Sequence, residues 1–269
     1  MYKRFNLKLD QKSTQNDLYV NSNSITQFKE NFKRDKSDLC SKVSEKFSAD
    51  TALDGSEITK EWFPQENWDV FISHSHNDKD LAIHLAAWLQ RTFDLKVFVD
   101  SFIWGSADEL LIAIDNEYCV LREEKNNVTY NYDKRNFSTS HVHMMLSGAL
   151  SDVIYNTECI IFLNTPNSIN INGLEDKETN SPWIYNEIKI TSIVEKHYPR
   201  EFVCKENAIL ENFNYNQAKK RNLEIGYKIT EELNEFKKLT LQDLIKWKEE
   251  CNNKIHPLDH LYFNLEDEN

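Results

Sequence analysis

The sequence predicts an α/β fold with a central parallel sheet flanked by helices. Three predicted strands, at 70–72, 95–101 and 159–163, each contain a short apolar run of the kind found in a buried strand. Between the first two runs, apolar side chains recur at i, i+4, i+7 and i+8 from Leu81, which is the spacing of one face of a helix. A strand, a helix and a second strand joined by short connections form the βαβ unit of a parallel sheet.

The other elements of this central part follow in chain order. After residue 101 we expect a loop and then a short helix, and residues 122–137 show no clean period, which indicates an insertion loop. A second helical stripe at 142–154 leads into the third strand. A polar loop at 166–180 then precedes one more helix.

The two flanking parts have weaker patterns. Apolar residues at mostly three- and four-residue steps from Ile25 to Phe47 predict a helix pair or hairpin, and a loosely packed, solvated leader is the alternative. Residues 223–229 alternate like a half-exposed edge strand, and Thr240 with Asp243 forms a capping box ahead of a closing helix. The chain therefore divides into a mostly helical N-terminal extension at 1–66, a central domain at 67–200 with an insertion at about 102–137, and a C-terminal edge strand and helices at 201–269 that pack on the central domain.

Composition narrows the classes of partner. The chain has 32 basic and 44 acidic side chains among 269 residues, and its net charge of −12 repels nucleic acid and anionic lipid. No apolar run approaches the roughly 18 residues of a membrane helix, and the first residues lack the apolar core of a secretion signal. We therefore expect a cytoplasmic protein that binds neither nucleic acid nor a membrane.

Cysteine, histidine and glycine usage excludes several kinds of site. The five cysteines include no CxxC pair and are expected as reduced thiols. His76, His141 and His143 lack a Cys or carboxylate partner at ligand spacing, so we expect no metal. No two of the five glycines are close enough for a GxGxxG turn or a Walker loop, so a nucleotide has to be held by side chains, strand ends and helix N-termini.

Polar side chains follow the first two predicted strands. Ser73 and His74 end the first strand, and Asp100 and Ser101 end the second. Because ligands of open parallel sheets bind outside the carboxyl ends of the strands, these four residues are candidates for a binding site.

The segment after the third strand, "SPWIYNEI", adds a tryptophan and a glutamate to this edge. Ser181 and Pro182 are a typical N-cap and first residue of a helix. Trp183 and Glu187, at i and i+4, then lie on one face of its first turns. The sequence thus places a flat ring and a carboxylate near a helix N-terminus at the ligand edge of the sheet.

The segments "DVFISHSHNDKDLAIHLAAWL", "LKVFVDSFIWG", "ECIIFLNTP" and "SPWIYNEI" resemble the Toll/interleukin-1 receptor (TIR) domain, in particular its standalone bacterial members. The resemblance covers roughly 67–200, and the Ser-x-Trp-x-x-x-Glu pattern at 181–187 is its most specific part. It implies a flavodoxin-like fold and, by that match, makes Glu187 the residue that cleaves NAD+ at the nicotinamide-ribose bond. It further implies self-association, a phage-derived trigger, and a cyclic or modified ADP-ribose signal read by a downstream effector, as in Thoeris-type antiphage defence.

The chemistry of this bond suits a single carboxylate. The pyridinium leaving group departs neutral, so the barrier lies in the oxocarbenium-like ribose, which Glu187 can stabilise while holding the ribose hydroxyls. If water is excluded, another nucleophile can attack the ribose and give a cyclic or transferred product. NAD+ is then the substrate, no cofactor is required, and the residues expected to contact it are Phe71, Ser73, His74, Asp100, Ser101, Trp104 and Trp183.

Alternatives remain for each of these residues. Taken alone, Glu187 reads as a solvated helical glutamate, Trp183 as a core residue, and Ser73 with His74 as a helix cap. Asp100, Ser101 and Trp104 can instead mediate self-association.

Two rival functions use related folds. One is a non-catalytic TIR scaffold that acts by self-assembly, with the 102–137 insertion as its contact surface. The other is a nucleoside deoxyribosyltransferase-like enzyme, which also directs a sheet-edge glutamate at an N-glycosidic bond. Turnover of nucleosides as against NAD+ separates the two enzymes.

Overall fold

A five-stranded parallel sheet forms the centre of the molecule, with its strands in the spatial order β3, β2, β6, β1, β10. The computed structural model describes residues 3–9, 17–31, 53–63, 67–124, 127–172, 176–194, 226–251 and 255–266. The strands of the sheet are β1 (Lys3–Leu7), β2 (Val70–Ser73), β3 (Val97–Val99), β6 (Cys159–Leu163) and β10 (Lys237–Leu239). The predicted α/β fold with a parallel sheet is confirmed, and it is compatible with a flavodoxin-like arrangement.

The first strand of the chain was not expected. Residues 1–66 were predicted as a mostly helical extension, yet β1 lies inside the sheet, between β6 and β10, with Phe5 opposite both Ile161 and Lys237. Phe5 and Leu7 point to one face and are fully buried. The described residues of this extension also include the helices α2 (Ser22–Asn31) and α4 (Gly55–Trp62), and part of the helical stripe expected up to residue 47 falls outside the described residues.

Helices cover both faces of the sheet, each around its own apolar cluster. One face is covered by α2, α5 (Lys79–Phe93), α10 (Leu241–Glu250) and α11 (Pro257–Glu266), and a short 3₁₀ turn, η1 (His76–Asp78), leads into α5. The opposite face is covered by α4, α6 (Ser101–Tyr118), α7 (Tyr132–Asn156), α8 (Pro182–Ile193) and α9 (Thr230–Asn234). Strand side chains alternate between these clusters, as the two-residue period of a strand requires.

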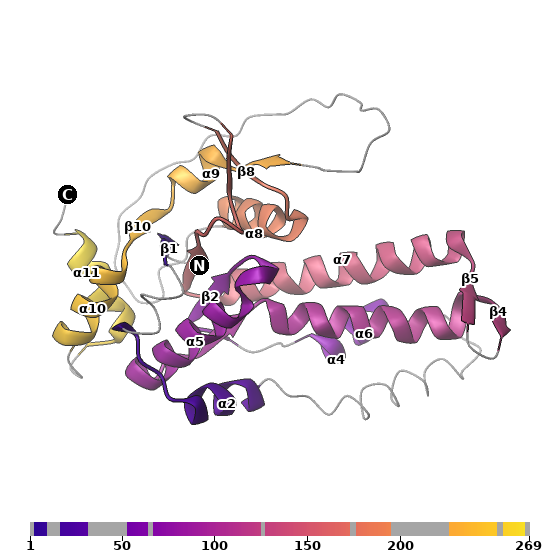
Figure 1. Ribbon diagram of the computed structural model, residues 1–269, viewed down its shortest axis with the longest axis horizontal. Coiled ribbons are helices and arrows are strands. Elements are labelled where there is room, and N and C mark those ends of the chain that lie inside the picture. The colour runs from indigo at the N-terminus through magenta and orange to yellow at the C-terminus, as the bar shows by residue number, and fades with distance from the viewer. Residues whose placement is uncertain are drawn as a thin grey trace.

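The predicted insertion contains two helices joined by a hairpin. The loop expected directly after residue 101 and the insertion loop expected at 122–137 are therefore wrong, whereas the helix expected between them lies within α6. Helix α6 starts at residue 101 without a loop, and α7 starts at 132. Between them lies the antiparallel hairpin of β4 (Val120–Glu124) and β5 (Asn127–Tyr130), and the two helices run side by side to this hairpin (Figure 1). Asp115 ties them together, because its carboxylate accepts hydrogen bonds from Arg135 Nε (2.8 Å) and Ser138 Oγ (2.5 Å). The spacing of residues within one helix gives no information about its contacts with another helix, so this pairing could not be predicted.

A small antiparallel sheet replaces the expected polar loop at 166–180. It consists of β7 (Asn170–Asn172), β8 (Asp176–Thr179) and β9 (Tyr227–Lys228). The edge strand expected at 223–229 is therefore short within the described residues and pairs with β8. The capping box of Thr240 and Asp243 is present at the start of α10, as predicted. None of the helices described for this chain is both long and apolar enough to cross a membrane.

Candidate functional site

The candidate site lies where the strand order of the sheet reverses. From β2 the chain goes to β3 on one side and later returns to β6 on the other, and in such sheets the carboxyl ends of these strands form the ligand crevice. Ser73, the last residue of β2, lies opposite Phe162 of β6. Helix α8 begins as predicted, with Pro182 in its first turn and the Ser181 side chain accepting a hydrogen bond from Ile184 N (3.3 Å). Glu187 of this helix lies next to Ser73 at the carboxyl end of β2.

Glu187 is buried at this crevice, only 1% exposed. Ser73 Oγ donates a hydrogen bond to its Oε2 (2.6 Å), whereas Oε1 has no hydrogen-bond partner among the described residues. The reading of Glu187 as a solvated helical glutamate is therefore wrong. The small space beside the carboxyl leaves no room for a water molecule, and it is lined by Phe71, Ser73, Ile160, Phe162, Glu187, Ile188, Thr191 and Phe236.

A buried ion pair lies next to this glutamate. His74 Nδ1 is 2.7 Å from Asp100 Oδ1, and neither side chain is exposed to solvent. Asp100 directly follows β3, the neighbour of β2, so its carboxyl comes from the same edge of the sheet as Ser73. The strand ends thus bring together a hydroxyl, an imidazole and two carboxyl groups.

The protonation of these groups follows from burial and from their mutual charges. Burial, and then the charge of Asp100, raise the pKa of Glu187 well above its ordinary value. A side-chain interaction with Asp100 adds to this rise, and the Ser73 hydrogen bond opposes it only in part. Burial acts to lower the pKa of His74, but the charge and hydrogen bond of Asp100, together with the Ile72 backbone and the charge of Asp78, outweigh it, so the pKa of His74 is raised. Both raised pKa values favour the protonated forms, a neutral Glu187 carboxyl and a cationic His74 beside Asp100.

The remaining predicted residues fall into different surroundings. Phe71 lines the space beside Glu187 and stacks on Phe98 (centroids 5.4 Å apart). Ser101 is buried at the start of α6, and its Oγ has no hydrogen-bond partner in the part of the chain that the structure describes. Trp183 is half-buried and meets His143 of α7 edge-on (5.4 Å), and it does not line the space beside Glu187. Trp104 belongs to α6, but its side chain lies outside the described residues.

The contacts that Arg4 makes beside helix α8 could not be predicted from the sequence. Arg4 of β1 is 6% exposed and donates to the carbonyl oxygen of Thr191 in α8 (3.1 Å) and to Glu235 Oε2 (2.5 Å). Its guanidinium lies over the ring of Phe236 (5.3 Å). The available signal was the alternation of apolar Phe5, Leu7 and Leu9, which is typical of a strand.

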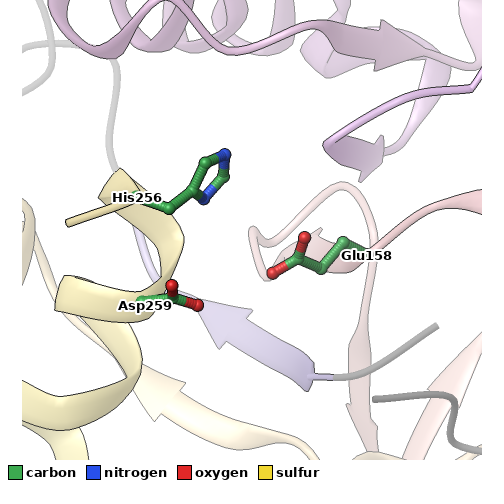
Figure 2. A group of neighbouring side chains, drawn as sticks. All are labelled: Glu158, His256 and Asp259. Atoms are coloured by element: carbon green, nitrogen blue, oxygen red, sulfur yellow. The ribbon is translucent and has the colours of Figure 1, made fainter. Parts of the chain in front are cut away.

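A second group of ionisable residues lies at the other end of the sheet. Glu158, just before β6, and His256 and Asp259, at the start of α11, are half-buried and offer ligand atoms within 4.8 Å of one another. Their side chains face a common space (Figure 2), and an imidazole with two carboxylates is a donor set that divalent transition metals accept. We call this group the amino-edge cluster, since Glu158 precedes β6 whereas Ser73 ends β2. It was not foreseen, because its members are far apart in the sequence.

Comparison with known proteins adds no relative: no family model, curated protein or solved structure matches the chain. The fold and the site together define an α/β protein with a parallel five-stranded sheet and a closed, carboxyl-containing site at the reversal of its strand order.

Proposed function

We propose that the protein is a TIR-type NAD+ nucleosidase or ADP-ribosyl cyclase that cleaves the nicotinamide-ribose bond, with Glu187 as the catalytic residue. One observation carries this proposal. A carboxyl group is buried where ligands of such sheets bind, one of its oxygens is fixed by Ser73, and the other has no partner in the described structure. A buried polar atom without a partner is costly, so its persistence favours a role in binding or reaction.

The reaction needs little beyond this carboxyl. The C1′–N bond breaks, its electron pair stays on the nitrogen of nicotinamide, and positive charge develops on the ribose. An ionised Glu187 stabilises that charge at close range in a site that excludes water. Water or a second nucleophile then bonds to C1′ and loses its proton, giving ADP-ribose or a cyclic or transferred product.

The closed site favours an enzyme that is inactive until a trigger opens it. The packing beside Glu187 has no room for a substrate, so α8 and its neighbours have to separate from the strand ends before NAD+ binds. This requirement agrees with a TIR-type sensor that awaits assembly or a phage-derived trigger, whose product signals to a downstream effector in antiphage defence. The cationic nicotinamide ring also favours ionisation of Glu187 on entry.

The test compares wild type with Glu187→Gln, which keeps the shape of the side chain and removes its charge. The matched control is Glu117→Gln, at an exposed position of α6. Each protein is incubated at high concentration with NAD+, and in parallel with a deoxynucleoside and a free base, with and without lysate of phage-infected cells. Mass spectrometry resolves the products, and unfolding curves check that each variant is folded.

We expect nicotinamide release by wild type and by Glu117→Gln, and a loss on the order of a hundredfold or more in Glu187→Gln. A cyclic or conjugated ADP-ribose identifies a signalling enzyme, and plain ADP-ribose identifies NAD+ depletion. Base exchange on the deoxynucleoside without NAD+ cleavage would assign the site to a deoxyribosyltransferase-like enzyme. Absence of Glu187-dependent turnover under every condition would refute the proposal in favour of a scaffold.

A further inference from the structure

The buried ion pair beside Glu187 has a role of its own. We propose that His74 and Asp100 are positioning residues that hold the proton on Glu187 in the closed site, and that they do not contact the substrate. The consequence for turnover rests on the proposed function, whereas the protonation itself can be measured without any turnover.

The geometry places all the required groups within one buried layer. Ile72 of β2 pairs with Val99 of β3, so Ser73, which ends β2, and Asp100, which directly follows β3, are neighbours at the carboxyl edge of the sheet. Ser73 holds Glu187 through its hydroxyl (2.6 Å), and His74 holds Asp100 (2.7 Å). The sheet register therefore fixes the two carboxyl groups next to each other, away from water.

Two buried carboxyl groups this close do not both ionise, because each charge destabilises the other in a medium of low polarity. One proton is therefore retained by the pair. The imidazole decides which carboxyl keeps it, since an adjacent cation stabilises Asp100 as the anion. Glu187, whose partner is the neutral hydroxyl of Ser73, is left with the proton, and its raised pKa agrees with this assignment.

Other charged groups around the site are engaged elsewhere. Among the described residues, Arg4 bonds to Thr191 and Glu235, and Lys189 pairs with Glu232. Asp78 accepts hydrogen bonds from Thr165 and Asn167. His143 of α7 contacts the Trp183 ring. Asp100 is the only charged group whose effect on the pKa of Glu187 is resolved among the described residues.

This arrangement makes the closed site inactive. A neutral carboxyl stabilises an oxocarbenium ion far less than a carboxylate does, so Glu187 has to lose its proton before it can act. Nicotinamide release should therefore rise with pH along a limb set by the raised pKa of Glu187. Replacing Asp100 by asparagine removes the like charge, lowers the pKa of Glu187 and shifts that limb to lower pH.

The same shifts give a stability profile with a defined sign. The pKa of both Glu187 and His74 is raised in the folded protein, so the stability that each contributes is complete below its ordinary pKa. That stability is lost as pH rises through the raised values. Wild type therefore loses stability as pH rises from the ordinary pKa values, 4.5 for Glu187 and 6.5 for His74, up to the raised ones. In Asp100→Asn this loss should end at lower pH and be smaller, because both folded-state pKa values fall.

The test follows protonation directly. Infrared spectra of wild type minus Glu187→Gln isolate the carboxyl band of Glu187, and NMR of labelled histidine follows the ring of His74. Both are titrated in wild type and in Asp100→Asn. The control is Asp115→Asn, because Asp115 is also a buried aspartate bonded to a cation and a hydroxyl, but in the α6–α7 pair. The pH profile of nicotinamide release is measured on the same proteins.

We expect the protonated band of Glu187 to persist at neutral pH in wild type and in Asp115→Asn, and to disappear at a pH lower by about one unit or more in Asp100→Asn. The limb of nicotinamide release should move by the same amount. An unchanged titration of Glu187 in Asp100→Asn would overturn the inference. If that variant fails to fold, the wild type still decides, because titration of His74 at or below about 6.5 would overturn it as well. A shifted titration without any NAD+ turnover would support the inference and reject the proposed function.

Discussion

Replacing Arg4 by alanine tests how β1 supports the helix that carries Glu187. Arg4 is almost fully buried, and it joins β1 to the carbonyl oxygen of Thr191 near the end of α8 (3.1 Å). Its loss leaves that buried carbonyl without this donor, which costs about 1–3 kcal/mol. Loss of the contact with Phe236 adds about 0.5–2 kcal/mol. We therefore expect the free energy of unfolding to fall by about 3 kcal/mol.

The measurement is urea unfolding followed by circular dichroism, with Glu235→Ala as the matched control. Glu235 forms the ion pair with Arg4, but its own side chain is 59% exposed, and removing it leaves the Arg4 bond to α8 and the contact with Phe236 in place, so Glu235→Ala should be less destabilising than Arg4→Ala. The reasoning is refuted if Arg4→Ala is no less stable than Glu235→Ala, since Arg4 would then contribute only an exposed ion pair.

Two further predictions concern α8 and the amino-edge cluster. Ser181→Ala removes the N-cap of α8 and should lower the free energy of unfolding by about 1 kcal/mol in the same urea assay, whereas Ser192→Ala, at an exposed position of that helix, should change it by less than about 0.5 kcal/mol; equal effects would contradict the capping role. Because the amino-edge cluster lies at the end of the sheet opposite Glu187, chelation of divalent cations with EDTA should leave nicotinamide release unchanged, and a loss of release would place a metal in the reaction.

The strands differ in how far the sequence could predict them. β2 and β6 lie inside the sheet, and β3 lies at its edge. Helices cover both faces of all three strands, so their sequences are continuous apolar runs. β1 is just as buried, but it carries Arg4 and Asn6 on one face. Those polar side chains are tolerated because partners from distant segments satisfy them, such as Thr191 for Arg4 and Asn164 for Asn6. Such partners have no local signature, so the strand was missed.

The sequence was enough to predict that residues at the strand ends and in α8 come together, but not that the crevice between them is closed. Because the carboxyl ends of parallel strands converge at one edge of a sheet, the sequence alone was enough to group Ser73, Asp100 and Glu187. The closure of the crevice and the pairing of His74 with Asp100 depend on side-chain packing across α8 and the sheet. Periodicity and motif spacing carry no information about such contacts.

The position of β1 also bears on the order in which the molecule can assemble. This strand is synthesised before both of its neighbours, since β6 and β10 follow it by many residues in the sequence. The first strand therefore has to wait, unpaired, while the segment that carries Glu187 emerges from the ribosome. Contacts between such distant segments slow folding, and they make completion of the sheet depend on both ends of the chain at once. Because Arg4 reaches α8 only after β1 has docked, this anchor of the proposed catalytic helix depends on the pairing of β1 with the sheet.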